Sequence, residues 1–315
     1  MKELRIVFMG TPDFAVGILR ELVQKDYPIA GVVTAPDKPS GRGQKVTPSA
    51  VKEFALTHRL PLLQPHSLKD ESFLNNLKAW NANLQIVVAF RMLPRVVWDM
   101  PNYGTFNLHA SLLPQYRGAA PIQWAIINGA TETGVTTFFI DEQIDTGAII
   151  ASKRIAITDK ETAGSLHDKL MTLGSALVLE TVDAIAKGTV KTMPQPQDQN
   201  LKSAPKLTAE NTRIDWNRPS LEIDRLIRGL APYPTAWTEL HNGSKVLKTK
   251  IYEGHIIHKP SLDVPGTIIP SNKELLVATQ DGYLQLELLQ LPGKKKMSVR
   301  DLMNGFALEK EAQFV

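Results

Sequence analysis

The sequence contains no cysteine, so it can form no disulfide framework, no thiolate nucleophile and no cysteine-ligated zinc or iron–sulfur site. A reducing compartment is consistent with that composition. No apolar run approaches the ~20 residues of a membrane-spanning helix, and the first residues enter a strand pattern without a basic, apolar-cored leader. We therefore expect a cytoplasmic protein that has no membrane partner.

A strong excess of charge of either sign is also absent. The net charge is only +4 over 315 residues, which permits a nucleic-acid partner without requiring one. With 43% hydrophobic residues the chain can bury a sizeable core, and its length exceeds that of one average domain. Two domains are the natural expectation.

The glycine-rich fingerprint of dinucleotide-binding proteins is missing too. Residues 4–9 and 29–34 are short apolar runs typical of buried parallel strands, and an amphipathic helix pattern lies between them. Gly10 ends the first run without the second and third glycines of the fingerprint. The N-terminal part is therefore predicted to be an α/β domain with a doubly wound, mostly parallel, Rossmann-like sheet, but one that does not bind NAD.

An amide and an imidazole lie two residues apart where another apolar strand ends. Side chains alternate along a strand, so Asn107 and His109 should share one face. Ligands usually bind at the carboxyl ends of the strands in such sheets, and an amide donor beside an imidazole suits a developing oxyanion. On these two residues alone, a turn-capping asparagine and a buried structural histidine remain an open alternative.

The residues around this pair favour an oxyanion-binding site over a purely structural role. Beyond Asn107 and His109, a diagnostic pattern is formed by Ser111, Leu112, Leu113, Pro114 and Gly118, with Asp145, Thr146 and Gly147 further on and matching stretches at 10–15 and 117–123. This pattern resembles the signature of the formyltetrahydrofolate-dependent formyltransferases. The resemblance covers the chain nearly from end to end.

The resemblance implies a formyl transfer from 10-formyltetrahydrofolate, the cosubstrate, to an amine. Asn107 and a protonated His109 would donate hydrogen bonds to the tetrahedral oxyanion. Asp145 would favour the imidazolium by its charge and assist proton movement from the amine. We expect no metal, because the spacing of Asp141, Glu142 and Asp145 matches no EF-hand.

The resemblance also places the folate at the ends of two strands. The strand at 84–89 and the loop after it would contribute backbone contacts to the pterin ring, although Phe90-Arg91 replaces the aromatic-glycine pair of many relatives. The candidate cosubstrate-binding residues are Val88, Phe90, Arg91, Met92, Ser111, Leu112, Leu113, Pro114 and Asp141.

The sequence changes character after a long helix pattern at 162–187. Residues 189–212 are rich in proline and glutamine and lack periodicity, as a linker would. Five short strand patterns then follow, at 237–240, 245–258, 266–269, 275–279 and 283–291. They fit an OB-like β-barrel, which is also the C-terminal fold that the resemblance implies. We predict a catalytic domain at 1–188, a linker at 189–212 and an OB-like tRNA-binding domain at 213–315.

Basic residues gather in the long insertion at 34–51, in the linker and on the expected barrel. Together with the barrel they resemble the members of the family that act on initiator methionyl-tRNA in translation initiation. The candidate tRNA-binding residues are Lys38, Arg42, Lys45, Lys206, Lys245, Lys248, Lys294, Lys295 and Lys296. We expect a monomer. Two alternatives stay open: a formyltransferase for glycinamide ribonucleotide or an amino sugar nucleotide, and a non-enzymatic RNA-binding protein.

Overall fold

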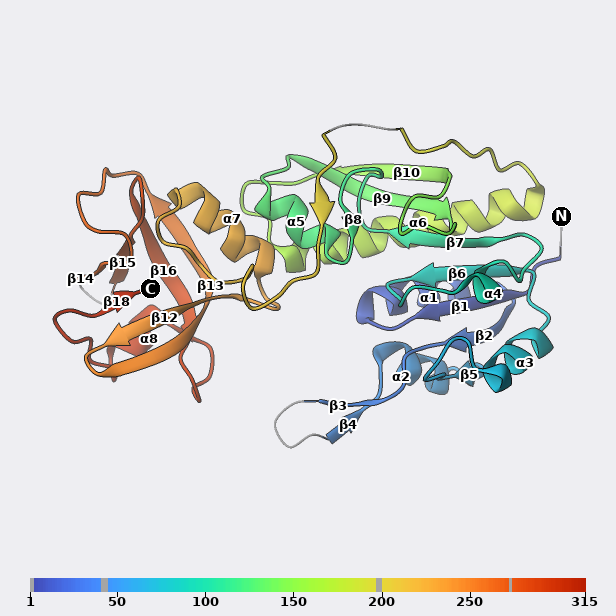
Figure 1. Cartoon of the computed structure of the whole chain (residues 1–315), viewed down its shortest axis with the longest axis horizontal. Coiled ribbons are helices and arrows are strands. Elements are labelled where there is room, and N and C mark those ends of the chain that lie inside the picture. The colour runs from blue at the N-terminus through green and yellow to red at the C-terminus, as the bar shows by residue number, and fades with distance from the viewer. Residues whose placement is uncertain (1–2, 41–44, 197–199, 272–273) are drawn as a thin grey trace. The chain divides into compact units, whose positions relative to one another are not determined.

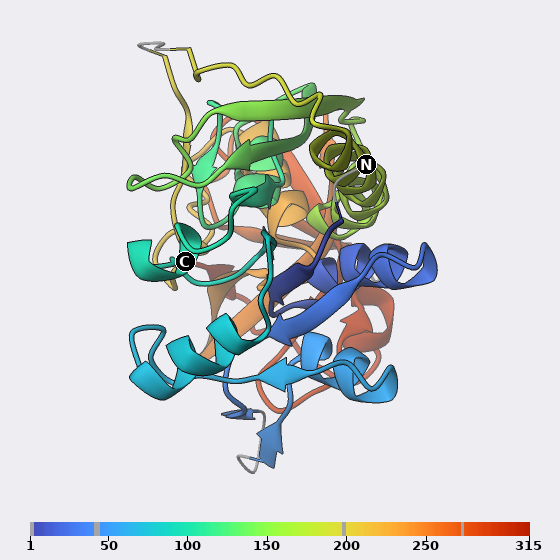
Figure 2. The same cartoon turned by 90° about the vertical axis from the view of Figure 1, so that its right-hand side faces the viewer.

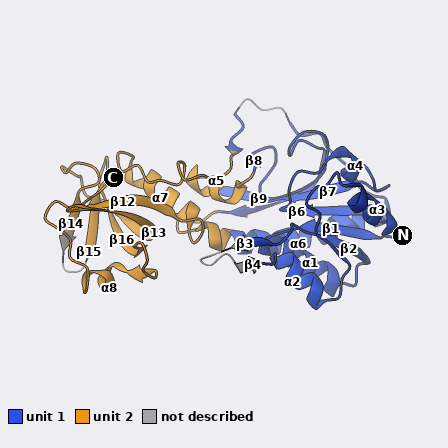
Figure 3. Ribbon diagram, turned by 60° about the horizontal axis from the view of Figure 1, so that its bottom comes forward, with its two compact units in different colours: residues 1–118, 132–156, 167–203 blue, residues 119–131, 157–166, 204–315 orange. Residues whose placement is uncertain are grey.

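The structure, a computed structural model, describes residues 3–40, 45–196, 200–271 and 274–315 (Figure 1). The chain divides into two compact units, coloured separately in Figure 3. Unit 1 comprises residues 1–118, 132–156 and 167–203, and unit 2 comprises residues 119–131, 157–166 and 204–315. Within the described residues, no helix is both long enough and apolar enough to cross a membrane.

Unit 1 is built on a seven-stranded sheet with the strand order β10-β9-β7-β6-β1-β2-β5. Its five strands from β7 to β5 are parallel, whereas β9 runs antiparallel to both β7 and β10. This confirms the predicted doubly wound, mostly parallel sheet. The strands are β1 (Ile6–Gly10), β2 (Ile29–Val33), β5 (Leu62–Leu63), β6 (Leu84–Val88), β7 (Thr105–His109), β9 (Glu132–Phe139) and β10 (Ile149–Ala156).

Helices cover both faces of this sheet, as Figure 2 shows. On one face Val7, Met9 and Val87 pack against Phe73 and Val97 of two helices. On the other face the long helix passes so close that a side chain in place of Gly174 would meet Leu108 at 2.8 Å. Because both faces are covered, β1 and β6 are buried at every position and are apolar except for the buried Gln85. The helices that cover the two faces are α1 (Asp13–Gln24), α2 (Ala50–Thr57), α3 (Glu71–Ala79), α4 (Arg95–Trp98) and α6 (Ala163–Lys187).

The basic insertion at 34–51 has structure of its own. Two short strands, β3 (Lys38–Ser40) and β4 (Lys45–Thr47), pair antiparallel, with Lys38 opposite Thr47. Ser49 then begins α2 by accepting a hydrogen bond from the Lys52 N–H at 3.1 Å. The insertion is therefore a hairpin that leads into a capped helix. Arg42 lies outside the described residues.

Unit 2 contains an antiparallel sheet with the strand order β14-β15-β16-β13-β12-β18. A bridge between Thr267 and Gln313 links its two ends, so the sheet is nearly closed into the predicted barrel. The five predicted strands are present, and two short ones were missed because two residues are too few to show alternation. The strands are β12 (Ala236–Asn242), β13 (Lys245–Ile257), β14 (Ile268–Ser271), β15 (Glu274–Ala278), β16 (Tyr283–Gln290), β17 (Met297–Ser298) and β18 (Gln313–Phe314). Two-residue strands β8 (Arg117–Gly118) and β11 (Ser203–Ala204) complete the described strands.

The alternation along β12 decides which side chains the barrel presents. Ala236, Thr238 and Leu240 are buried, and Thr238 accepts a hydrogen bond from the Trp216 indole at 3.0 Å. Trp216 stacks in turn on Phe314 of β18, with 5.5 Å between the ring centres. Trp237 lies on the outer face of the same strand. This core holds β18 against β12 and fixes the outward direction of Trp237.

Unit 2 also includes α5 (Pro121–Ile127), although this helix lies between two strands of the other unit in the chain. It packs on α7 (Ser220–Leu230), where a side chain in place of Gly229 would meet Ile127 at 2.6 Å. The short helix α8 (Val299–Met303) completes the unit. Each compact unit is therefore made of several separate segments of the chain. The predicted boundaries at residues 188 and 212 stay a prediction.

The N-terminus of α7 rests on Asp281, which generates a prediction about pH and stability. Asp281 Oδ1 accepts hydrogen bonds from the Ser220 N–H at 2.8 Å and the Ser220 hydroxyl at 2.9 Å. These bonds, the backbone one above all, lower the pKa of Asp281. A lowered folded-state pKa means that the carboxylate stabilises the fold above its unfolded pKa of ~3.9, and that this contribution is lost as pH falls through the folded pKa.

We therefore expect Asp281→Asn to lower the free energy of unfolding near pH 7, by up to ~1 kcal/mol as is typical of exposed charges at helix ends. Urea titrations at several pH values measure the difference, which should shrink below the unfolded pKa of ~3.9 and be lost once the pH has fallen through the lowered folded-state pKa. Asp159→Asn, at another exposed position, is the control. A difference between wild type and Asp281→Asn that stayed the same from pH 7 down to about pH 2 would contradict this account.

Candidate active site

The candidate site lies where β6 and β7 end side by side. Asn107 pairs with Val87 and Leu108 pairs with Val88, so the carboxyl end of β7 lies next to that of β6. Asn107 and His109, two residues apart on β7, lie on one face of the strand. Asn107 and His109, two of the predicted catalytic residues, and Val88, a predicted cosubstrate-binding residue, therefore lie at the carboxyl ends of neighbouring strands, where ligands usually bind.

The two ring nitrogens of His109 have different surroundings. Nε2 lies 2.8 Å from the carbonyl oxygen of Tyr116, and because a carbonyl can only accept, Nε2 must carry a proton. Nδ1 lies 3.8 Å from Asp145 Oδ2, and the whole residue is only 6% exposed. Nδ1 is thus the ring nitrogen that faces the carboxylate.

Asp145 is held in place by the backbone around it. Its Oδ2 accepts a hydrogen bond from the Gly118 N–H at 3.0 Å, and its own backbone has a positive φ of 56°. Two residues later, a side chain in place of Gly147 would meet the carbonyl oxygen of Phe139 at 1.7 Å. The loop can therefore pass this point only with glycine, which fixes where the Asp145 carboxylate points.

The segment from Ser111 to Gly118 folds back over the end of β7. The Ser111 hydroxyl donates to the Gln115 carbonyl at 2.6 Å, while Thr136 donates to the Ser111 carbonyl at 2.7 Å and accepts from the Leu113 N–H at 3.2 Å. These bonds bring the carbonyl of Tyr116 onto His109. Ser111 is fully buried, and it stabilises the loop through its hydroxyl.

Asn107 has an unfulfilled hydrogen-bonding capacity. Its Oδ1 is buried and has no partner among the described residues, and its side chain is only partly buried. A buried acceptor without a donor costs ~1–3 kcal/mol, which a ligand N–H would offset. Asn107 is therefore suited to a ligand that brings a donor to its Oδ1.

The loop after β6 departs from the expected pattern in a way that the structure explains. Arg91 donates to the carbonyl of His66 at 2.9 Å and to that of Pro65, and its guanidinium lies 5.6 Å from the ring centre of Phe90. Burial lowers the pKa of Arg91. Arg91 thus fixes the neighbouring loop, whereas Met92 is 73% exposed.

The carboxylates of the loop between β9 and β10 have separate partners. Asp141 accepts hydrogen bonds from the Thr146 hydroxyl at 2.8 Å and the Gln143 N–H at 3.1 Å, which close the loop. Glu142 pairs with Arg95 at 3.1 Å. Nowhere in the described ranges do three acidic, histidine or cysteine side chains form a group that could hold a metal ion.

Gln195, in the predicted linker, is a site residue that the sequence did not reveal. Its Nε2 donates to the carbonyls of Asp145 and Gly147, both at 2.9 Å, and its Oε1 accepts from Arg117 at 3.1 and 2.5 Å. Met193, nearby in the chain, bridges to Ile149 of β10. No periodicity or motif marks a glutamine in a proline-rich stretch, so these contacts could come only from the structure.

The candidate basic residues are distributed over both units. Lys206 and Lys248 line one cleft in unit 2, whereas Lys245 is exposed at the start of β13. Lys294, Lys295 and Lys296 are exposed in the loop between β16 and β17. In unit 1, Lys38 lies on β3 and Lys45 on β4.

Comparison with protein families matches both parts of the chain. Residues 4–182 match the family described as "Formyl transferase", and residues 206–307 match "Formyl transferase, C-terminal domain". A methionyl-tRNA formyltransferase of Flavobacterium johnsoniae is 58% identical over 313 residues, which are 99% of each chain.

Two solved structures share the fold at lower identity. HypX from Aquifex aeolicus in complex with tetrahydrofolic acid aligns with a TM-score of 0.66 at 18% identity, over 97% of this chain. The match spans about half, 48%, of the HypX chain. The sugar 3N-formyl transferase WlaRD, in the presence of dTDP and 5-N-formyl-THF, aligns with a TM-score of 0.65 at 21% identity, over 94% of this chain and 100% of that one.

The contacts of Gln195 generate a prediction about the rigidity of the site. Gln195→Ala removes the donor to the Asp145 and Gly147 carbonyls, so the Asp145 carboxylate should be less firmly held and the Gly118 N–H should exchange faster with solvent. Amide hydrogen exchange followed by NMR or mass spectrometry measures this. The control is Gln143→Ala, which truncates an exposed glutamine in the loop that contains Asp145. It should leave the exchange of the Gly118 N–H unchanged. Equal exchange at Gly118 in Gln195→Ala and wild type would refute a holding role.

Proposed function

The chain belongs to the formyl transferase family, and from that premise we propose that it transfers the formyl group of 10-formyltetrahydrofolate to the amino group of initiator methionyl-tRNA. The observation that carries the proposal is the cluster of Asn107, His109 and Asp145 in a chain that matches a methionyl-tRNA formyltransferase along its whole length. We further propose that it acts as a monomer in the cytoplasm, where charged tRNA is used.

In the proposed reaction, the amine nitrogen attacks the formyl carbon of 10-formyltetrahydrofolate and forms a tetrahedral intermediate, whose carbonyl oxygen becomes negative. The intermediate then collapses as the bond to N10 breaks. Asn107 and His109 would donate hydrogen bonds to the oxygen that becomes negative. Because Nε2 of His109 is occupied by the Tyr116 carbonyl, the donor to this oxygen would be Nδ1–H. The proton that leaves the amine balances the one that N10 gains.

Asp145 would act on this reaction through charge and proximity. Its Oδ2 lies 3.8 Å from His109 Nδ1, close enough for the carboxylate to stabilise a proton on that nitrogen. The same carboxylate could take the proton from the attacking amine, directly or through a water molecule. The buried, unpaired Oδ1 of Asn107 fits a cosubstrate or amine that brings an N–H donor.

The proposed folate-binding residues are those at the ends of β6 and β7 together with Asp141. The proposed tRNA-binding residues are the lysines of the barrel, the linker and the hairpin β3–β4. A small amine would need only the residues around Asn107, so these lysines favour a polyanionic substrate.

The experiment is a formylation assay with three amines in parallel: methionyl-tRNA, glycinamide ribonucleotide and an amino sugar nucleotide. We expect only methionyl-tRNA to be formylated at a high rate. Asp145→Ala and His109→Ala should lower that rate by ~10²-fold or more, as loss of an oxyanion donor or acid–base group typically does.

Glu142→Ala is the matched control, because Glu142 is an exposed carboxylate of the same loop that pairs with Arg95. Thermal unfolding should show that all variants fold. Preferential formylation of a small amine would refute the proposed substrate, and wild-type turnover in Asp145→Ala would refute the proposed site.

A second prediction concerns Arg42, between the two strands of the basic hairpin. Its planar guanidinium can bind a phosphate in a bidentate way, and the flanking Gly41 and Gly43 permit close approach of the backbone. Arg42→Ala should therefore lower kcat/KM for methionyl-tRNA by ~10-fold or more and leave the KM for folate nearly unchanged. Lys69→Ala, an exposed position outside the hairpin, should have no effect. Unchanged kinetics in Arg42→Ala would favour a small-amine substrate.

A further inference from the structure

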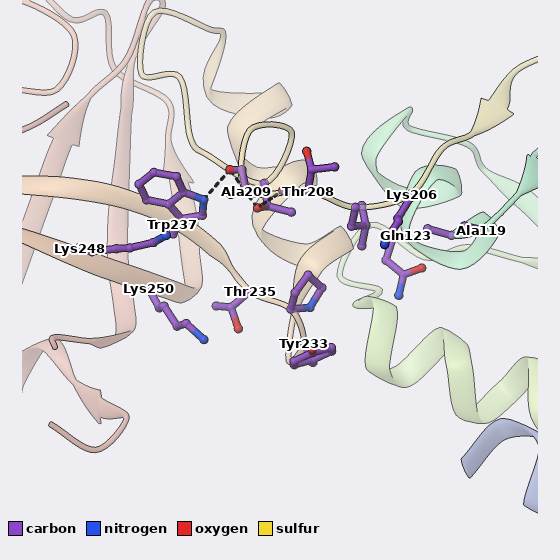
Figure 4. Close-up of a pocket in the computed structure, with 14 residues that line it drawn as sticks. Ala119, Gln123, Lys206, Thr208, Ala209, Tyr233, Thr235, Trp237, Lys248 and Lys250 are labelled. Atoms are coloured by element: carbon purple, nitrogen blue, oxygen red, sulfur yellow. Dashed lines mark hydrogen bonds between the residues drawn. The ribbon is translucent and has the colours of Figure 1, made fainter. Parts of the chain in front are cut away.

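A cleft of about 470 Å³ opens within unit 2, between the outer face of the barrel and the segments that surround it (Figure 4). Strands β12 and β13 contribute Trp237, Lys248 and Lys250. Lys206 and its neighbours contribute a second wall, and Gln123 of α5 lies beside them. Tyr233 projects from the turn before β12. This volume lies in the range of sites that hold a group the size of one nucleotide.

The charge of this cleft is of one sign. Its described lining contains three lysines and no carboxylate. Glu239, which lies opposite Lys248 in the sheet, pairs with Arg213 at 3.1 Å, outside the lining. Lys206 and Lys250 have no carboxylate within ion-pair distance in the part of the chain that the structure describes. Their ammonium groups are therefore available to an anion that enters from solvent.

The two aromatic side chains of the cleft, Trp237 and Tyr233, differ in how firmly neighbouring groups hold them. The Trp237 indole donates to the Ala209 carbonyl at 2.8 Å, and Lys248 Nζ lies 3.8 Å from its ring centre. Trp237 is therefore a fixed wall. Tyr233, by contrast, is 80% exposed, an unusual state for a large aromatic side chain. An exposed aromatic ring beside unpaired lysines is the arrangement on which unpaired nucleic-acid bases stack.

The second wall is held by its own hydrogen bonds. The Thr208 N–H donates to Asn211 Oδ1 at 2.8 Å, and the Thr212 hydroxyl donates to the Thr208 carbonyl at 2.6 Å. Beside Tyr233, the Thr235 hydroxyl donates to the Pro232 carbonyl at 3.0 Å. The cleft is thus a preformed feature on rigid segments, which lowers the entropic cost of binding.

We propose that this cleft is a subsite for an unpaired ribonucleotide of the RNA substrate, with one base stacked on Tyr233 and the flanking phosphates beside Lys206 and Lys250. This inference rests on the proposed function, because methionyl-tRNA is the RNA that would occupy the cleft. It assigns a binding role to Tyr233, which charge patterning could not indicate because the side chain is uncharged. Within the cleft, Lys248 also holds Trp237.

The experiment uses the full chain and two probes: methionyl-tRNA, and a fluorescein-labelled single-stranded oligouridylate of eight nucleotides. Tyr233→Ala should raise the Kd for both probes by ~5- to 100-fold, the range expected for the loss of one stacked base. Tyr233→Phe should restore binding, because it keeps the ring and loses only the hydroxyl. Lys250→Gln should weaken binding. It should also lower the slope of log Kd against log salt concentration by about 1, as expected for the loss of one phosphate contact.

Val246→Ala is the control, since Val246 is an exposed residue of β13 outside the cleft. The KM for folate should be the same in every variant. Wild-type Kd values in Tyr233→Ala, or equal weakening by Tyr233→Phe, would overturn the stacking role. Equally strong competition by a fully paired RNA duplex would overturn the requirement for an unpaired nucleotide.

The two proposals fail in distinguishable ways. If wild type does not formylate methionyl-tRNA, the proposed function is wrong, whereas the oligouridylate measurements still decide whether Tyr233 binds an RNA base. If formylation occurs and Tyr233→Ala has the wild-type KM for methionyl-tRNA, the function stands and the subsite is refuted.

Discussion

The hydrogen bond from His109 Nε2 to the Tyr116 carbonyl sets the geometry on which the candidate site depends. It forms because residues 111–118 fold back over the end of β7, and that fold is held by Ser111 and Thr136. Since a carbonyl only accepts, the bond decides which ring nitrogen keeps its proton. It also leaves Nδ1 facing Asp145, so one backbone contact selects the tautomer, the ring orientation and the nitrogen available for chemistry.

Asp145 is fixed from segments that are distant in the sequence. The Gly118 N–H binds its carboxylate, and Gln195 binds its backbone carbonyl and connects it to Arg117. A carboxylate held at both its side chain and its backbone has little freedom to turn toward water. Preorganisation of this kind lowers the reorganisation that accompanies charge development in a reaction.

Local pattern was sufficient for the framework and for part of the site. Strand alternation placed Asn107 and His109 on one face, and β2, β6 and β13 begin at the residues that their strand patterns predicted. The unpredicted parts depend on contacts between distant residues. Gln195 reaches Asp145 across 50 positions, and Arg91 reaches Pro65 across 26, so neither leaves a periodic or compositional trace. Asp145 was identified only because it matches the family motif. The motif marks the residue but gives no information about the distant residues that hold it.

The position of α5 restricts how this chain could be divided or recombined. The helix lies between β7 and β9 in the sequence, yet its partner surface is α7, which begins almost a hundred residues later at Ser220. A gene fragment that ends at residue 188 would leave the α5 surface that meets Gly229 exposed to water, an apolar patch prone to self-association. Exchange of the C-terminal part between homologous genes would succeed only when α5 and α7 come from the same parent. The two helices should therefore be inherited together.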